Sequence, residues 1–306
     1  MKGRLYIDGI DTYVQYGIWI TEGGYNDLLS FPDLSDPEKN DWPEEDGVEV
    51  DLEAPTLKYK EVSITFVSSV PFRSAYDFIY KLSEPGYHVF SIPGLNREWR
   101  LRLLSHPANE EWDTLTSLTL KFSEDLPVRP ASITPDGNGV LIPKSMYEID
   151  GIQLDRYGVV VEEGLDEILK SPTVKQNLTK TFSTSDGRLY DAEHLVFQSK
   201  DVTLKCVMIA DSIERFWKCY DAFFHSLIQP GERTLFCDWS YEEYPCYYKK
   251  CSGFNIASLT GRVIVEFNLT LVFTVCRVNE QDFLLATEDD ELIVTEDGEY
   301  YIDLKE

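Results

Sequence analysis

The sequence predicts an α+β protein dominated by β-strands, with two similar β-sandwich or flattened-barrel domains that each carry one flanking helix. The first observation is a set of short motifs that occurs twice in the same order, about 140 residues apart. The second is the alternation of apolar and polar residues in several segments, which is typical of strands with one buried face. The third is a single apolar stripe with helical spacing in each copy.

The repeat runs through most of the chain. Ile7-Asp8-Gly9-Ile10 returns as Ile149-Asp150-Gly151-Ile152, and Tyr16-Gly17 returns as Tyr157-Gly158. Later blocks keep the same order, including the pair Pro85-Gly86 and Pro230-Gly231. A period of this length indicates a duplicated domain, because solenoid repeats have roughly 20 to 50 residues. We assign residues 1–128 to the first domain, 129–144 to a Pro- and Gly-containing linker, 145–279 to the second domain and 280–306 to an acidic C-terminal strand extension.

Each copy is expected to open with a strand, to turn at Asp-Gly and to continue as a second strand through Tyr-Gly, with Ile18 and Ile20 on one face and Trp19 on the other. A long connection follows, over residues 22–47 in the first copy and 162–187 in the second. Connections of this length inside a compact domain usually have a function. Alternating strands are then predicted around residues 62–66 and 202–206.

A helix follows in each copy, and both helices are predicted to end at Pro-Gly. In the second helix, Asp211, Ser212 and Glu214 are placed to cap the start, and Pro71 suits the first turn of the first helix. The aromatic stripes of both helices are expected to pack on a sheet. Shorter strands are predicted around residues 89–92, 99–104, 234–237 and 246–249, a long alternating strand over 263–275, and a small meander after Cys276.

The net charge of −26 is concentrated in two segments. Residues 33–53 hold ten acidic residues against Lys39, and residues 280–306 hold eleven against Lys305. A solvated loop and tail explain such segments, and a surface of this sign repels nucleic acid, since phosphate binding needs clustered Lys and Arg. The start of the chain has no apolar signal segment, and no run approaches the roughly 18 apolar residues of a membrane span, so we expect neither secretion by a signal peptide nor a membrane span.

Motifs for catalysis, cofactors and metals are not recognised in the sequence. The four histidines do not recur at equivalent positions of the two copies, and no nucleophile-elbow, dinucleotide-binding or phosphate-loop motif occurs. All six cysteines lie in the second copy, and Cys246 and Cys251 have no second pair at zinc-ligand spacing, so buried free thiols are the better interpretation. The acidic turns of the C-terminal segment invite a calcium hypothesis, but they do not have the EF-hand spacing. We therefore predict no enzyme activity, no cofactor and no metal site.

The strand opening I-D-G-I, the following Y-G-I-W-I or Y-G-V-V-V, the long loop, the single helix and the final alternating strand together resemble the tail-tube-like domain of long-tailed bacteriophages. Tube proteins, distal tail proteins and baseplate hub proteins share this domain. The resemblance implies a virion structural protein that forms rings, either of three chains on the hub plan or of six on the distal-tail plan. It implies other tail or baseplate proteins as partners, and DNA only as a molecule that passes through a lumen without binding to it. It also implies a location in the host cytoplasm during assembly and in the virion tail afterwards.

The candidate interface for ring assembly is Asp41-Trp42-Pro43, where a large aromatic residue stands in a polar loop. Trp42 either contacts another chain or covers the edge of its own domain. The alternative function is a tandem β-sandwich that binds carbohydrate or acts in adhesion, with exposed aromatic residues that stack on sugars. The second copy offers a cluster for this role: Trp239, Tyr241, Tyr244, Tyr247 and Tyr248.

Overall fold

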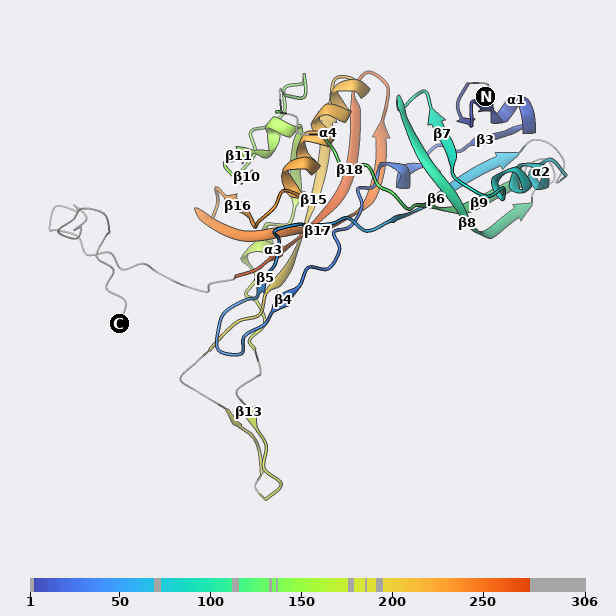
Figure 1. The fold of residues 1–306 in the computed structure, drawn as a ribbon. Helices are drawn as coiled ribbons and strands as arrows, with labels where there is room; N and C mark the ends of the chain where they lie inside the picture. The colour runs from blue at the N-terminus through green and yellow to red at the C-terminus, as the bar shows by residue number, and fades with distance from the viewer. Residues whose placement is uncertain are drawn as a thin grey trace.

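The structure is a computed structural model that describes residues 3–68, 73–111, 116–131, 134–135, 137–175, 179–184, 186–190 and 195–275. The predicted fold class is confirmed: the chain is β-dominated, with two seven-stranded antiparallel sheets of the same strand order (Figure 1). The first sheet has the order β2-β1-β7-β8-β9-β6-β3, and the second has the order β11-β10-β16-β17-β18-β15-β12. Each strand of the first copy therefore has a counterpart at the same place in the second.

The first copy contains the elements β1 (Tyr6–Ile7), β2 (Ile10–Asp11), α1 (Thr12–Tyr16), β3 (Ile18–Ile20), the 3-10 helix η1 (Asn26–Leu29), β4 (Lys39–Asn40), β5 (Glu49–Val50), β6 (Lys60–Ser68), α2 (Arg73–Leu82), β7 (His88–Ile92), β8 (Arg97–Glu111) and β9 (Thr116–Glu124). The second copy contains β10 (Tyr147–Ile149), β11 (Ile152–Gln153), η2 (Leu154–Tyr157), β12 (Val159–Glu163), α3 (Leu165–Leu169), β13 (Thr179–Lys180), β14 (Leu189–Tyr190), β15 (Lys200–Ala210), α4 (Ile213–Leu227), β16 (Arg233–Cys237), β17 (Glu242–Ser258) and β18 (Val263–Phe273).

The sheets curl because one long strand in each copy changes partner along its length. The start of β8 pairs with β7, and its later part pairs with β9 through two register shifts. In the second copy, β17 pairs first with β16 and then with β18, through three register shifts. Register shifts of this kind bend a strand and increase its twist. The repeated architecture is therefore a curved sheet whose hollow is filled by helix side chains.

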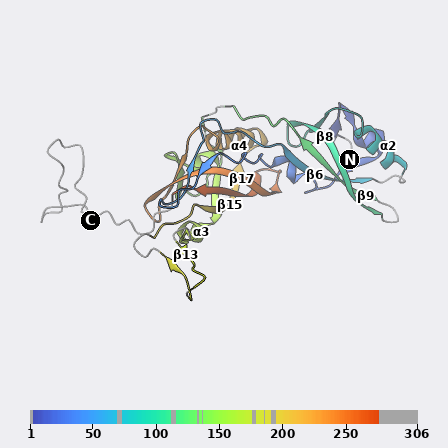
Figure 2. The same cartoon turned by 60° about the horizontal axis from the view of Figure 1, so that its bottom comes forward.

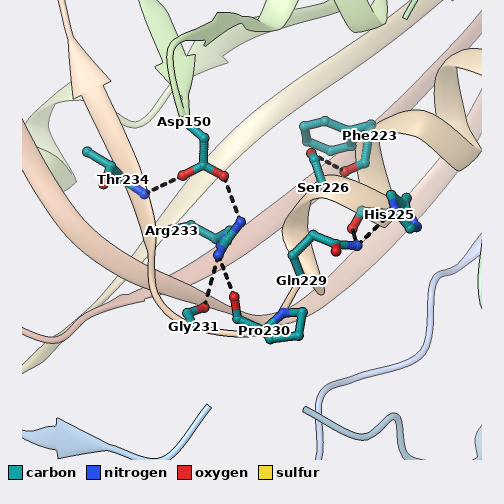
Figure 3. Close-up of polar contacts among 9 residues, drawn as sticks. All are labelled: Asp150, Phe223, His225, Ser226, Gln229, Pro230, Gly231, Arg233 and Thr234. Carbon is teal, nitrogen blue, oxygen red and sulfur yellow. Dashed lines mark hydrogen bonds and ion pairs between the residues drawn. The ribbon is translucent and has the colours of Figure 1, made fainter. Parts of the chain in front are cut away.

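The repeated Asp-Gly forms the tight turn of the first hairpin in each copy. Asp8 and Asp150 both have a φ of 51°, and the glycines that follow them have φ of 77° and 75°. Two successive positive φ values define the turn that joins twisted antiparallel strands, which explains the choice of Asp-Gly. The aspartate also fastens the hairpin to the next strand: Asp150 accepts hydrogen bonds from the Thr234 backbone N–H at 3.0 Å and from Arg233 at 2.9 Å (Figure 3).

The first copy makes the same connection with a different side chain. Asp8 accepts a hydrogen bond from the Val89 backbone N–H at 2.9 Å, and its second carboxylate oxygen lies 2.7 Å from His88 Nδ1. His88 therefore occupies the position that Arg233 holds in the second copy. The sequence comparison missed this equivalence, because a histidine and an arginine share no pattern until the strand register is known.

The expectation of a continuous strand through Tyr-Gly was wrong. Residues 12–16 form α1, which Asp11 caps by accepting hydrogen bonds from the Tyr13 and Val14 backbone N–H groups. Gly17 ends this turn in the left-handed conformation, with a φ of 67°. Gly158 does the same after η2, with a φ of 73°. The glycine of Tyr-Gly is thus a helix C-cap, and the strand starts after it. The predicted alternation in that strand is confirmed, with Ile18 and Ile20 buried and Trp19 half-buried.

The predicted aromatic helix of the second copy is α4, which begins after Ser212. The Ser212 hydroxyl accepts a hydrogen bond from the Arg215 backbone N–H at 3.4 Å, which selects Ser212 among the expected caps. Phe223 and Phe224 of α4 are fully buried and contact Phe267 of β18, with ring centroids 6.3 and 6.2 Å apart. The helix stripe is therefore core, as predicted. Pro71 and the predicted meander after Cys276 lie outside the described residues.

The buried apolar side chains of the two copies form one continuous cluster. The five described cysteines, Cys206, Cys219, Cys237, Cys246 and Cys251, are buried free thiols within the second copy. Burial raises the pKa of Cys246 to about 12 and also raises the pKa of Cys251. Among the described helices, none has the length and apolarity needed to cross a membrane.

Candidate assembly interface

The long loop of the first copy lies on the second copy of the same chain. Four backbone hydrogen bonds fasten it there, from Leu34 N to Lys249 O, from Gly47 N to Phe197 O, from Val48 N to Thr274 O and from Gly231 N to Leu52 O, with lengths between 2.8 and 3.0 Å. Figure 1 shows the blue segment around β4 and β5 beside the elements of the second copy, and Figure 2 shows the same from a view turned by 60°. The long connection therefore has a role in joining the two domains.

An aromatic side chain anchors this loop. Phe31 is 4% exposed, and its ring stacks on Phe224 of α4 at 4.3 Å with an interplanar angle of 11°. The rings of Tyr220 and Tyr248 approach Phe31 with centroid distances of 6.3 and 5.7 Å. Both tyrosine hydroxyls donate to loop carbonyls, Tyr220 to Leu29 O at 2.7 Å and Tyr248 to Pro32 O at 3.1 Å. Aromatic groups that carry a polar tip suit such an interface, because their hydroxyls satisfy the backbone that they cover.

A second contact joins the turn between β7 and β8 to α4. Trp217 donates its indole N–H to the carbonyl of the fully buried Leu95 at 2.6 Å. The Arg97 guanidinium lies 4.1 Å from the centre of a Trp217 ring and donates to the Asp221 carboxylate at 2.9 and 3.2 Å. A partly desolvated guanidinium gains both from a carboxylate and from an aromatic face. The turn and the loop together define the intrachain interface.

A pocket of about 230 Å³ lies within this interface. Lys60 lines it and is 8% exposed; it pairs with Glu124 at 3.0 Å and donates to the carbonyls of Leu28 and Ser30. Burial lowers the pKa of Lys60, and the charge of Glu124 opposes that shift. The second copy repeats the motif, since Lys200 donates to the carbonyls of Ile168 and Lys170. Because both copies have it, this lysine serves the fold by holding the start of the long connection against the sheet.

The sequence-predicted residues Asp41, Trp42 and Pro43 lie between β4 and β5, at the tip of the docked loop. Lys175 of the second copy reaches this tip with a side chain that is only 5% exposed. It pairs with Asp41 at 2.6 Å and donates to the carbonyls of Trp42, Glu45 and Gly47 at 2.7 to 2.8 Å. The Trp42 side chain itself is 51% exposed and donates its indole N–H to Glu49 at 3.3 Å. Asp41 and the Trp42 backbone thus join the two copies, while the indole remains accessible.

The loop of the second copy has the same construction, but beyond Lys175 its hairpin projects from the body of the molecule. Lys175 N donates to Val196 O as Ser35 N donates to Thr56 O, and β13 and β14 pair as β4 and β5 do. Figure 1 shows the β13 hairpin extending from the body of the molecule. Phe182 stands at the position of Trp42 and is 40% exposed. The anchor Phe31 is replaced by the exposed Ser171. The chain therefore provides one docked loop and one equivalent loop whose hairpin projects from the body.

The aromatic cluster considered for sugar binding does not form a single surface. Tyr248 is fully buried, Tyr247 and Tyr244 are half-buried, and Tyr244 stacks on Phe273 at 4.9 Å. Only Trp239 and Tyr241 of the five are exposed, at 60% and 80%. Both lie on the turn between β16 and β17.

The acidic charge of the docked loop lines a wide groove of about 1060 Å³, together with Glu232 of the second copy. The carboxylates concerned are Glu38, Glu49, Asp51, Glu53 and Glu232. Across the part of the chain that the structure describes, no group of three or more His, Cys, Asp or Glu residues is placed to hold a metal ion. The C-terminal segment of the calcium hypothesis lies outside the described residues.

Sequence reasoning missed the residues that join the copies, namely Phe31, Leu95, Arg97, Trp217 and Tyr220. Most of them differ in side chain from the residue at the equivalent position of the other copy. Phe31 corresponds to Ser171, and Arg97 corresponds to Glu242. A position-by-position comparison of the two copies would have singled out these differences, since a shared core position keeps its character while an interface position does not.

No protein-family model matches the chain, and no curated protein matches it. Among solved structures, the chain is similar to the crystal structure of SPP1 Dit, described as a paradigm of the hub adsorption apparatus in phages that infect Gram-positive bacteria. The identity is 12%, the TM-score is 0.32, and the match covers 88% of this chain and 97% of that one. A TM-score of this size does not establish a common fold.

Proposed function

We propose that this chain is a non-enzymatic structural subunit of a phage tail or baseplate, which assembles into rings through its β domains. The observation that carries the proposal is the head-to-tail docking of two equivalent modules within one chain. The loop and turn of the first module bind the second, and the second module presents an equivalent loop, whose β13 hairpin projects from the body, and an equivalent turn with Trp239 and Tyr241 exposed. Contacts of this heterologous type continue from copy to copy until they close a ring or form a filament.

The phage assignment comes from the sequence motifs of the tail-tube-like domain. On that plan, three chains of two modules or six chains complete a ring, and other tail or baseplate proteins are the further partners. The wide acidic groove and the net charge of −26 agree with a particle that lets DNA pass without binding it.

Sedimentation velocity over a wide concentration range, followed by negative-stain microscopy of the largest species, tests the proposal. The expected result is reversible self-association that ends in closed annuli of three or six chains. A protein that remains monomeric up to its solubility limit contradicts ring assembly, as does association into antiparallel pairs that close after two chains.

A further inference from the structure

The turns that join corresponding strands in the two sheets are equivalent but have different surroundings. Residues 93–96 link β7 to β8, and residues 238–241 link β16 to β17. One equivalent residue in each turn has the same unusual backbone conformation: Asn96 and Tyr241 have positive φ values of 51° and 54°. The first turn is covered by α4, with Leu95 fully buried. The second turn exposes Trp239 and Tyr241 to solvent.

The exposed turn is held in a fixed shape. The Tyr244 hydroxyl lies 3.2 Å from the Ser240 hydroxyl and 2.7 Å from the Glu242 carboxylate, and the Tyr241 backbone N–H donates to Cys237 O at 2.9 Å. A left-handed conformation is uncommon for a bulky residue, and such strained positions concentrate where a protein binds something. Tyr241 is thus a large exposed side chain on a fixed backbone, and a fixed backbone lowers the entropy that binding must overcome.

The helix α2 contains the counterparts of two α4 residues that contact the first copy and the linker. Alignment of Pro85-Gly86 with Pro230-Gly231 places Tyr76 at the position of Asp221 and Tyr80 at that of His225. In α4, Asp221 binds Arg97 of the first turn and His225 lies 3.1 Å from the Pro130 carbonyl of the linker. In α2, Tyr76 and Tyr80 are 56% and 78% exposed. Two tyrosines four residues apart lie on the same face of a helix.

We propose that the turn over residues 238–242 docks onto α2 of a second copy of this chain, repeating between chains the contact that the turn over residues 93–97 makes with α4 within the chain. This inference rests on the proposed ring assembly and assigns its contact surfaces. In Figure 1, β16 lies to the left of α4 and α2 lies at the far right, so one chain presents the two surfaces at separate places. Such an arrangement suits head-to-tail association.

The equivalence specifies one pair of positions across the contact. Glu242 corresponds to Arg97, and Tyr76 corresponds to Asp221. The intrachain ion pair is therefore replaced between chains by a carboxylate beside a phenol hydroxyl. Glu242→Arg combined with Tyr76→Asp transfers the Arg97–Asp221 pair into the contact between chains, and a double-mutant cycle measures whether the two positions meet.

The test is sedimentation equilibrium of the full chain and its variants, with circular dichroism and melting temperature as checks of folding. Trp239→Ala is expected to raise the dissociation constant about 10- to 100-fold, as for an aromatic hot spot. Tyr76→Asp places a carboxylate opposite Glu242 and is expected to weaken association at least 10-fold, because like charges repel. The double variant Glu242→Arg with Tyr76→Asp is expected to regain affinity to within about threefold of the original chain. Leu141→Ala removes a side chain that is 98% exposed and serves as the control, with no expected change.

The possible outcomes separate this inference from the function on which it rests. If the unmodified chain associates but Trp239→Ala has no effect and the two single changes simply add, the docking surfaces are wrong while ring assembly stands. If the unmodified chain remains monomeric, ring assembly fails as well. If Trp239→Ala abolishes binding to a glycan array and leaves self-association unchanged, the turn binds sugars and the inference is overturned.

Discussion

Replacement of Phe31 by alanine is the most direct test of how the two domains are joined. The Phe31 ring is 4% exposed and contacts Phe224, Tyr220 and Tyr248, all from the second copy. Hydrogen bonds on both sides, from Tyr248 to Pro32 O and from Leu34 N to Lys249 O, hold the loop backbone in place. The cavity therefore cannot collapse freely, and we expect Phe31→Ala to lower the free energy of unfolding by about 3 to 5 kcal/mol.

Two control variants separate the loss of the Phe31 contacts from the general effect of an alanine substitution. Ser171→Ala changes the equivalent exposed position of the second copy, and Tyr59→Ala removes an aromatic ring that is 61% exposed. Each is expected to change the free energy of unfolding by no more than about 0.5 kcal/mol. Comparison of the three variants isolates burial against the second copy as the cause of the Phe31 effect.

Urea denaturation, followed by both circular dichroism and tryptophan fluorescence, measures these differences. The continuous core predicts coincident transitions for the unmodified chain. Trp99 and Trp217 lie at the interface, with ring centroids 6.3 Å apart, so fluorescence is expected to change before circular dichroism in Phe31→Ala. If Phe31→Ala costs less than about 1 kcal/mol, or no more than Ser171→Ala, the loop is not anchored by this side chain and the reasoning is refuted.

Four further predictions address the loop tip, the charged groups and the thiols. Lys175→Met removes the ammonium that donates to the carbonyls of Trp42, Glu45 and Gly47, so a stability loss of about 1 to 3 kcal/mol and faster proteolysis at the loop are expected in urea and trypsin assays. Trp42→Ala is expected to weaken self-association in sedimentation experiments while the melting temperature changes little, because the indole is 51% exposed; a large loss of melting temperature would identify Trp42 as core. Hydrogen bonds from Arg102 and Ser123 lower the pKa of Asp125. Its stabilising contribution is therefore complete above about pH 4 and lost as pH falls toward the lowered folded value, which a carboxyl NMR titration and the pH dependence of Asp125→Asn check. In a Cys276→Ser chain, the five remaining thiols are expected to react with a thiol reagent at pH 8 only after denaturation, because all five are buried.

The sequence patterns correctly predicted the elements whose formation depends on residues close together in the sequence. The Asp-Gly hairpins, the aromatic helix α4 with its Ser212 cap and the alternating strand β18 all follow from spacing and turn residues that lie within a few positions of one another. Tyr-Gly was misinterpreted because a single helical turn is too short to show a period, and only the positive φ of Gly17 reveals it. The candidate residue Trp42 was found as an aromatic residue in a polar loop, and its role between chains stays a prediction.

Such patterns could not predict that the long loop of the first copy docks on the second copy. Phe31 and Tyr220 are separated by 189 positions in the sequence, and the hydrogen bond from Tyr248 to Pro32 O spans 216. A loop segment that pairs with a distant domain has neither a helical nor a strand period, because its contacts are set by the partner surface. What the sequence does contain is the contrast between the two copies, and that contrast becomes interpretable once the strand register identifies the equivalent positions.

In the assembly proposed above, the differences between the copies also explain why one junction forms within the chain and the other forms between chains. Phe31, Arg97 and Asp221 give the intrachain interface a buried ring and an ion pair, whereas the corresponding residues Ser171, Glu242 and Tyr76 provide neither. We therefore expect the intrachain junction to be the stronger of the two, so that the two domains join as the chain folds and before chains meet. In the proposed ring, the weaker junction would be built on the exposed Trp239 and Tyr241 and would depend on protein concentration and on the avidity of ring closure. A duplicated chain in which every junction had equal strength would have no such order of events, and open filaments would compete with rings from the start.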